Sequence, residues 1–328
     1  MKSLSNEIRR ARPLLGTIVE IGVPRGDAST AIEAAFREIE TIHRLMSFHD
    51  SSSDISRLNR SEPGEIVHLD HRTHEVLAYA QLMSQVSAGA FDVTVGGKLS
   101  EENFLPKPAQ AKTFDSQACF QDLVLLPNQS ITLTRRAWID VGGIAKGYAV
   151  DRAVMTLKKF GVVNGIVNAG GDLSVFGAAQ PVHVRHPENP SLTFPLGKIL
   201  NSAVASSSGC FNDHADVYQV SDPLVDPRRN RRLNWRFSVT VIAPRCIVAD
   251  ALTKVVRLAI RRAPRILSRF RAWALIIDRG GLQILHPEGN KGMTGMLKAA
   301  DRVMTAENLI QFHTSLRHFH ERAIRSYD

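Results

Sequence analysis

Residues 140–151 read DVGGIAKGYAVD and mark the point where an apolar segment turns into a helix that we expect to run to about Lys159. Gly142 and Gly143 precede this helix, so free backbone N–H groups and the positive end of the helix dipole meet at one place. Lys146 falls in the first turn, where a positive charge is unfavourable unless an anion lies nearby. The segment therefore predicts either an anion site or a glycine-rich turn with a solvated lysine. It fits neither the Walker A motif nor the dinucleotide-binding fingerprint.

A second glycine pair follows at the end of a predicted strand. The strand covers Gly165–Asn168 and runs into Gly170-Gly171-Asp172. A double glycine lets a ligand approach the backbone closely, but it also forms tight turns and bulges. Taken alone, the segment favours the turn.

A carboxylate near a helix start is the third candidate. Asp250 lies near the beginning of a helix predicted over Val248–Ile260. A carboxylate there suits the helix dipole, so a capping role is the simpler interpretation. Asp250 could also bind a hard cation such as Mg²⁺, which prefers oxygen ligands and usually takes one or two carboxylates together with phosphates.

The order of strands and helices predicts the fold class. A capping-box spacing, Thr30 and Glu33, is expected to start a helix over residues 27–46. Further helices are predicted at 71–86, from the glycines at 142–143 to about 159, at 248–260 and at 306–324. Strands are predicted at 17–23, 123–126, 131–133, 165–168, 182–185, 237–242, 274–277 and 282–285. These elements mix without regular βαβ alternation, which favours an α+β fold over a doubly wound sheet.

Composition is that of an ordinary globular chain. Of 328 residues, 44% are hydrophobic and 22% are charged, which excludes an intrinsically disordered chain. The cysteines Cys119, Cys210 and Cys246 lie far apart and form no Cys-x-x-Cys pair, so a zinc ribbon or disulfide framework is not expected. No apolar run reaches the length of a transmembrane helix, and no signal peptide or lipid-anchor cysteine is visible. We therefore expect a cytoplasmic location.

Positive charge is concentrated in one stretch. Of the formal net charge of +9, residues 226–273 carry twelve Arg and one Lys against two Asp. Such a stretch is either a solvated face or a surface for a phosphate-bearing ligand, a membrane or nucleic acid. Because aromatic residues are not interleaved with the arginines, we expect no nucleic-acid partner.

Taken together, the motifs resemble the ApbE family of FAD:protein FMN transferases. The similarity runs from about Arg12 to His286 and rests on several segments in the same order. These segments are Leu15-Gly16-Thr17, Met46-Ser47-Phe48, 53–59 (SDISRLN), 89–95 (GAFDVTV), 140–151 and 168–172. The resemblance implies an α+β, ApbE-like (T-fold-like) unit with two lobes. It also implies an FAD-binding and FMN-transfer domain over residues 1–293, followed by a helical extension over 294–328.

The chemistry that the resemblance implies is phosphoryl transfer. A Thr or Ser hydroxyl of an acceptor flavoprotein attacks the phosphorus on the FMN side of FAD, and AMP leaves. We expect catalytic roles for Asp250, Lys146 and Lys254, and the resemblance implies that Mg²⁺ is held by the carbonyl of Ala145 and by Asp250. Residues implied in flavin-nucleotide binding are Leu15, Gly16, Thr17, Asp92, Thr94, Asp140, Gly143, Lys146, Gly170, Gly171, Asp172 and Asp226.

Two positions depart from the family pattern. The family has a Thr four residues after the metal-binding Asp, where this chain has Lys254, and a neighbouring Thr253 is turned about 100° around the helix. The family's His-x-x-Asp-Pro-x-Thr-Gly reads PLVDPRRN here, with Pro223 at the His position and Asp226 retained. Lys254 could pair with Asp250 across one helical turn and replace the cation as a fixed positive charge. These departures leave two alternatives to the transferase: an FAD-binding homologue with weak or no transfer, and an FAD pyrophosphatase.

Overall fold

The computed structural model describes residues 7–26, 28–108, 110–185, 193–208, 224–233, 237–278 and 281–285. The helix predicted at 306–324, the proposed extension over 294–328 and Pro223 lie outside these residues. Within them, the fold is α+β with two lobes that share one core, which confirms the expected class. Buried residues of both lobes, such as Val19, Leu77, Ile131 and Leu252, belong to the same hydrophobic cluster.

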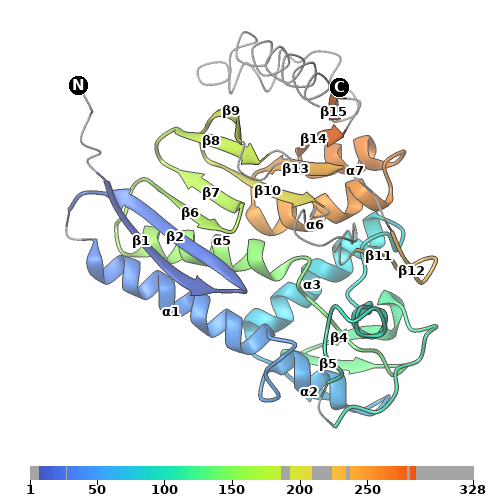
Figure 1. The fold of residues 1–328 in the computed structure, drawn as a ribbon. Coiled ribbons are helices and arrows are strands. Elements are labelled where there is room, and N and C mark those ends of the chain that lie inside the picture. Colours follow the sequence, from blue (N-terminus) through green and yellow to red (C-terminus); the bar gives the residue numbers. More distant parts are fainter. Residues whose placement is uncertain are drawn as a thin grey trace, which may run out of the picture.

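The first lobe is built on an eight-stranded sheet in which every neighbouring pair is antiparallel (Figure 1). Its spatial order is β1 (Glu7–Leu14), β2 (Thr17–Pro24), β6 (Gly165–Ala169), β7 (Asp172–Phe176), β10 (Ser202–Ser208), β13 (Ser238–Ala243), β14 (Trp273–Asp278) and β15 (Gly281–Leu285). Each predicted strand of this sheet is present, with bounds shifted by a residue or so. A separate ribbon pairs β8 (Gln180–Arg185) with β9 (Thr193–Ile199).

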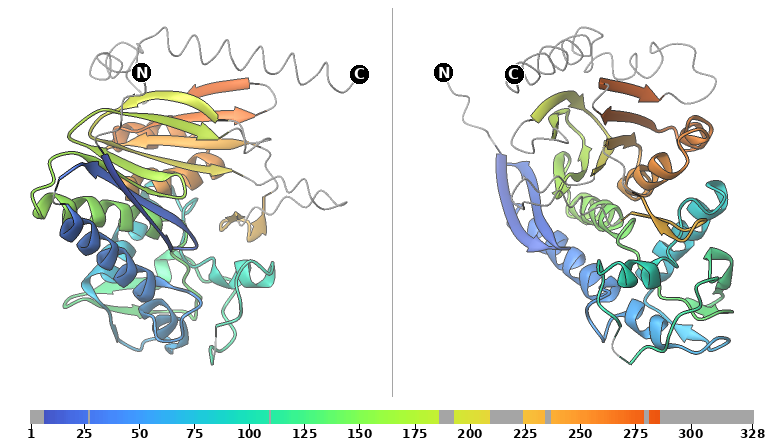
Figure 2. Two further views of the ribbon diagram at one scale, coloured as in Figure 1. Left: turned by 60° about the vertical axis from the view of Figure 1, so that its left-hand side comes forward. Right: turned by 45° about the vertical axis from the view of Figure 1, so that its right-hand side comes forward.

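Three helices cover one face of the sheet (Figure 2). They are α1 (Ser29–Met46), α5 (Ala145–Lys159) and α6 (Cys246–Leu258). Helix α5 packs against both α1 and α6, and α6 packs on β10 and β13. The amphipathic spacing of α1 explains its place, since Ile32, Phe36, Ile39 and Ile42 are all buried.

The second lobe holds the shorter elements. They are α2 (Asp54–Arg60), α3 (His71–Val86), α4 (Gly96–Glu101), a 3₁₀ turn at Phe120–Asp122 and the small sheet of β3 (Val67–His68), β4 (Leu123–Leu126) and β5 (Ser130–Leu133). The hairpin predicted around residues 123–133 is confirmed. Two further elements belong to the C-terminal half of the chain. The hairpin of β11 (Val225–Asp226) with β12 (Arg231–Arg232) precedes β13, and α7 (Ala263–Arg269) follows α6.

Two predicted helix starts are wrong. Helix α1 begins after Ala28 with no side-chain cap, so Thr30 and Glu33 form no capping box. Glu33 instead accepts from the Arg12 guanidinium at 2.7 and 2.8 Å. Helix α6 begins at Cys246, which places Asp250 in the second turn and excludes it as the capping residue.

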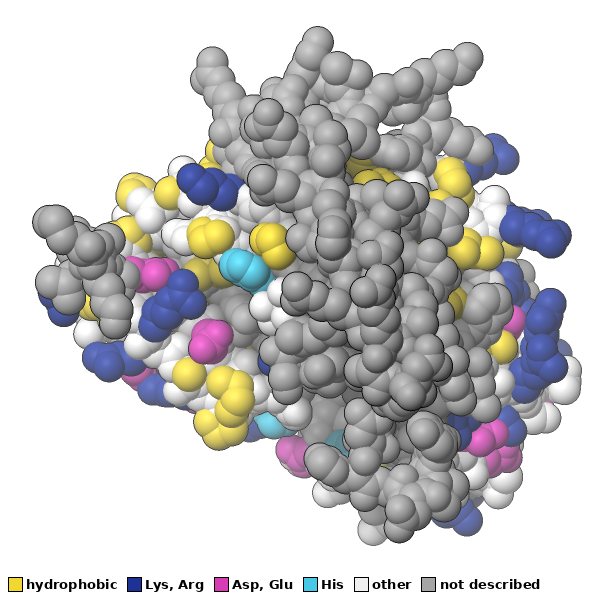
Figure 3. All heavy atoms as spheres, turned by 45° about the horizontal axis from the view of Figure 1, so that its top comes forward, with side chains coloured by type: hydrophobic (Ala, Val, Ile, Leu, Met, Phe, Trp, Pro, Cys, Tyr) yellow, Lys and Arg dark blue, Asp and Glu magenta, His cyan; other side chains and the backbone are white. Residues whose placement is uncertain are grey.

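The basic stretch divides between surface and interior. Five arginines on and beside α7 are exposed, namely Arg261, Arg262, Arg265, Arg269 and Arg271. Lys and Arg side chains gather at one edge of the face shown in Figure 3, on the side where α7 lies in Figure 1. Arg257, by contrast, is only 2% exposed. Across the described ranges, none of the helices combines the length and apolar character needed to span a bilayer.

Candidate functional site

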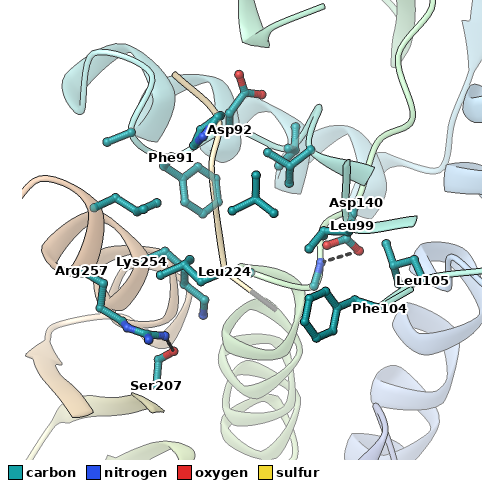
Figure 4. Close-up of a pocket in the computed structure, with 18 of the residues that line it drawn as sticks. Phe91, Asp92, Leu99, Phe104, Leu105, Asp140, Ser207, Leu224, Lys254 and Arg257 are labelled. Atoms are coloured by element: carbon teal, nitrogen blue, oxygen red, sulfur yellow. Dashed lines mark hydrogen bonds between the residues drawn. The ribbon is translucent and has the colours of Figure 1, made fainter. Parts of the chain in front are cut away.

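A cavity of about 500 Å³ lies where the segment between α3 and α4 faces α6 (Figure 4). The end of β10 and the start of the β11–β12 hairpin complete its walls. Its apolar lining includes Phe91, Val93, Leu99, Phe104, Leu105 and Leu224, and its polar lining includes Asp92, Asp140, Ser206, Ser207, Ser208, Lys254 and Arg257. Apolar walls with a few charged groups are typical of small-molecule sites.

Lys254, which the sequence analysis expected to act as a fixed positive charge beside Asp250, lines this cavity. Its ammonium forms an ion pair with Asp250 Oδ1 and also donates to the Asp250 carbonyl oxygen at 3.1 Å. The predicted pairing across one turn of helix is thus confirmed. Asp250 itself is completely buried, so Lys254 stands between this carboxylate and the cavity.

The second oxygen of Asp250 ties α6 to α5. The backbone N–H of Gly147 donates to Asp250 Oδ2 at 3.0 Å. A Cβ at Gly147 would lie 2.8 Å from Asp250 Cβ and 2.6 Å from the Cys246 carbonyl carbon, so only glycine allows this approach. The close contact fixes Asp250 and Lys254 relative to the first turn of α5.

The capping role predicted for Asp250 belongs to Asp151 of α5. Its carboxylate accepts from the backbone N–H groups of Cys246 at 2.8 Å and Ile247 at 3.1 Å. Arg245 lies 3.4 Å from the same carboxylate. Burial raises the pKa of Asp151 above its usual value, while these two N–H donors act in the opposite direction. Asp151 therefore fixes the N-terminus of the helix that carries Lys254.

Lys146 is partly buried and already has a carboxylate partner within the protein. It lies in the first turn of α5, as predicted, and forms an ion pair with the buried Asp172 at the start of β7. Burial lowers the pKa of Lys146, but the nearby carboxylates of Asp250 and Asp172 outweigh it and the net shift is upward. Burial, together with the charge of Asp250, raises the pKa of Asp172. Lys254, Asp250, Lys146 and Asp172 therefore form a row of alternating charges that leads away from the cavity.

Two hairpin turns that contain glycine lie beside each other. Leu15 and Gly16 form the two-residue β1–β2 turn with φ of 56° and 71°, and Gly170 and Gly171 form the β6–β7 turn with φ of 64° and 103°. A Cβ at Gly170 would contact the Thr17 side chain, with Thr17 Cβ at 3.0 Å. The structure confirms the turn at Gly170-Gly171 and brings the Leu15–Thr17 segment beside it.

Asp92 and Thr94 hold a loop together at the cavity wall. Asp92 Oδ1 accepts from the Thr94 N–H at 2.8 Å and from its hydroxyl at 2.7 Å, and Oδ2 accepts from the Phe120 N–H at 2.8 Å. In Figure 4 the carboxylate points away from Lys254 and Arg257. Burial raises the pKa of Asp92 although these donors lower it.

Asp140 and Gly143 line the cavity directly. Asp140 Oδ1 accepts from the Gly142 N–H at 3.2 Å, and burial raises the pKa of Asp140. A Cβ at Gly143 would meet Phe91 at 3.5 Å and Lys254 Cε at 3.6 Å. The glycine loop before α5 therefore packs on the stem of Lys254.

Asp226 acts at a distance from the cavity. It is buried and accepts two hydrogen bonds from the Arg228 guanidinium, at 3.0 and 3.1 Å. Its neighbours Val225 and Pro227 line the cavity. Asp226 thus anchors the hairpin that closes one side of the site.

Arg257 is the cavity residue that the sequence reasoning missed. Its guanidinium donates to Ser207 Oγ at 3.2 Å and lies 5.8 Å from the centre of the Phe237 ring. It follows Lys254 by three residues, so both fall on one helix face. The sequence carried two signals for Arg257. It is spaced three residues from Lys254, and an arginine within the apolar run VVRLAI is unusual.

These residues do not fit a Mg²⁺ ion at Asp250. Oδ1 is paired with Lys254 and Oδ2 accepts from Gly147. The Thr253 hydroxyl donates back to the Asp250 carbonyl at 2.7 Å and is completely buried, so it does not replace the missing ligand. Ala145 is buried as the first residue of α5. No cluster of three or more His, Cys, Asp or Glu suited to a metal occurs in the ranges described above.

Comparison with known proteins points to one family. The model of the ApbE family matches residues 15–276. An FAD:protein FMN transferase of Vibrio cholerae is 25% identical over 268 residues, which covers 76% of this chain and 80% of the relative. The FAD:protein FMN transferase of Haemophilus influenzae is 25% identical over 256 residues, which covers 70% of this chain and 73% of the relative.

Solved structures show the same fold. The flavin transferase ApbE of Vibrio cholerae superposes with a TM-score of 0.73 at 22% identity, covering 87% of this chain and 98% of that one. The ApbE protein of Thermotoga maritima gives a TM-score of 0.71 at 26% identity, covering 86% and 97%.

Proposed function

Because the chain belongs to the ApbE family, we propose that it is an FAD:protein FMN transferase, which moves FMN from FAD to a Thr or Ser hydroxyl of an acceptor flavoprotein. The curated relatives carry that activity in their names. Their agreement favours transfer over the binding-only and pyrophosphatase alternatives.

The cavity beside α6 is the observation that carries this proposal. Its volume of about 500 Å³ lies within the range of roughly 300–1,000 Å³ typical of small-molecule sites. Phe91, Phe104 and Leu224 offer apolar surface to the ring systems of FAD, and Lys254 and Arg257 offer positive charge to its diphosphate. The cavity therefore combines apolar surface for rings with positive charge for phosphates.

The reaction needs a hydroxyl oxygen to attack the phosphorus on the FMN side. A new O–P bond forms, the bond from that phosphorus to the bridging oxygen breaks, and AMP leaves with the electron pair. The hydroxyl proton is released to solvent water, which balances the additional negative charge on the AMP that leaves. Catalysis of such a transfer is mainly positioning and stabilisation of charge on the phosphate oxygens and the leaving group.

This chain supplies that stabilisation from α6. Lys254 is the residue we place on the diphosphate, and Asp250 holds its ammonium in position. Lys146 and Asp172 form the next pair behind it and position Asp250. Asp250 and Lys146, which the sequence grouped with the catalytic residues, thus act as positioning residues.

Asp140, Gly143 and the Leu15–Thr17 and Gly170–Asp172 turns remain proposed flavin-nucleotide residues. Asp140 and Gly143 line the cavity, whereas the two turns lie next to each other at one end of strands β1, β2, β6 and β7. Asp92, Thr94 and Asp226 contribute by fixing the loop and the hairpin that form the cavity walls. We assign no step to Mg²⁺, since the donors around Asp250 do not fit it. A cytoplasmic location, which cell fractionation would test, also remains part of the proposal.

Product analysis tests the function. The purified chain is incubated with FAD and the acceptor flavoprotein of the Vibrio cholerae relative. We expect AMP in solution and covalent flavin on the acceptor, which is read by flavin fluorescence of the denatured protein. Free FMN with AMP would instead show a pyrophosphatase, and intact bound FAD would show a binding protein. Either of these results overturns the transferase assignment.

A further inference from the structure

We propose that this site binds FAD without a divalent cation, and that Lys254 and Arg257 together supply the positive charge that the diphosphate requires. The inference deepens the proposed function and rests on it, because FAD is the ligand that brings the diphosphate. It assigns a ligand-binding role to Arg257 that the sequence resemblance did not give.

The position of Lys254 is the first step. Its ammonium is held at two points by Asp250, through the carboxylate and through the carbonyl oxygen. Its side chain is 19% exposed, while that of Asp250 is fully buried. The lysine is thus a fixed cation in the cavity lining, and Figure 4 draws it among the other lining residues.

Arg257 adds a second cation one helical turn further on. Figure 4 shows its guanidinium on the same side of α6 as Lys254, bonded to Ser207 of β10. Both residues line the cavity. A guanidinium matches phosphate oxygens with two parallel N–H donors, whereas an ammonium acts as a point charge. The pair can therefore contact both phosphates of one diphosphate.

The positions of the charges support the substitution. The ammonium of Lys254 lies on the Asp250 carboxylate, where the family resemblance placed the cation, and Arg257 adds a second positive charge to the cavity lining. The diphosphate would therefore meet positive charge from two side chains without a metal.

A metal ion would have to displace what is already there. The ammonium of Lys254 occupies one Asp250 oxygen, and the Gly147 N–H occupies the other. Protonated lysine has no lone pair to offer a cation, and it would repel a divalent ion at this distance. Mg²⁺ also gives up its water ligands reluctantly, so the site disfavours it on both counts.

A Mg²⁺ titration of FAD binding tests the proposal without relying on turnover. The affinity of the full chain for FAD is measured by flavin fluorescence, in EDTA and at increasing Mg²⁺. We expect the wild-type dissociation constant to change by less than about twofold, since no metal ligand set is open. In Lys254→Thr, which removes the ammonium, we expect FAD binding in EDTA to weaken about tenfold, as for the loss of one charge-assisted contact. Added Mg²⁺ should then restore much of it.

Three variants control for trivial effects. Lys159→Thr removes an exposed lysine at the far end of α5 and should leave FAD binding unchanged. Lys254→Arg keeps the positive charge and should stay independent of Mg²⁺, which preserves the test if Lys254→Thr fails to fold. Arg257→Lys should retain more affinity than Arg257→Gln, with circular dichroism confirming that both are folded.

The outcomes separate this inference from the proposed function. A strong, saturable gain in wild-type affinity on adding Mg²⁺ overturns the metal-free site while leaving the transferase assignment intact. Undiminished binding by folded Lys254→Thr in EDTA overturns it as well. Failure of the wild-type chain to bind FAD under any of these conditions would refute the proposed function itself.

Discussion

Gly147→Ala should destabilise the protein strongly, because α5 and α6 approach each other through this residue. A methyl group there would overlap the Cys246 carbonyl oxygen, and it would lie 2.6 Å from the carbonyl carbon and 2.8 Å from Asp250 Cβ. Two of these three atoms belong to the backbone of α6, so rotation of a side chain cannot relieve the overlap. The helices would have to separate, at a cost toward the upper end of the ~1–3 kcal/mol typical of overpacking.

The same movement would weaken the bond from the Gly147 N–H to Asp250 at 3.0 Å. Hydrogen bonds to charged groups contribute about 1.5–3 kcal/mol. A partial loss of this bond on top of the overpacking cost gives an expected total loss of about 4 kcal/mol in the free energy of unfolding. Urea denaturation followed by circular dichroism measures it. Gly26→Ala is the matched control, because a Cβ there meets nothing within 4 Å. An unfolding midpoint for Gly147→Ala equal to that of the control would refute the helix–helix contact as described.

Two other predictions concern carboxylates. Asp151→Ala removes the acceptor for two backbone N–H groups at the start of α6 and should cost ~1–2 kcal/mol of stability, measured as a lower melting temperature; an unchanged value would contradict the capping role. Asp140→Asn should stabilise the fold at neutral pH, because burial raises the folded-state pKa of Asp140 and a raised carboxyl pKa makes the ionised form unfavourable above the unfolded-state value. The gain should vanish in acid, where the carboxyl group is protonated in both states, and a melting temperature lowered at neutral pH would be inconsistent with this sign.

Local patterns were sufficient for much of the fold. Strand periodicity located β2, β6, β13, β14 and β15 of the eight-stranded sheet but not β1, β7 and β10, and the spacing of Asp250 and Lys254 predicted their pairing. The turn at Gly170-Gly171 was also predictable, because positive φ angles favour glycine. These features depend on residues a few positions apart, which is the range over which sequence rules operate.

What failed depended on distant partners. Asp151 caps a helix that begins 95 residues later, and Glu33 is engaged by Arg12 from another element instead of starting a capping box. The ion pair of Lys146 in α5 with Asp172 in β7 joins residues that are 26 positions apart, and the first-turn position of Lys146 did not predict this partner. The cavity is lined by segments near residues 91, 140, 207 and 254. No local sequence pattern predicts that these distant segments lie together.

The stoichiometry of AMP release against covalent flavin tests the transferase assignment most directly. In a single-turnover mixture of the chain, FAD and the acceptor of the Vibrio cholerae relative, AMP is quantified by chromatography and flavin on the acceptor by mass spectrometry. Transfer predicts one AMP released for each flavin attached to a Thr or Ser of the acceptor, with no free FMN. AMP accompanied by free FMN and an unmodified acceptor would contradict it.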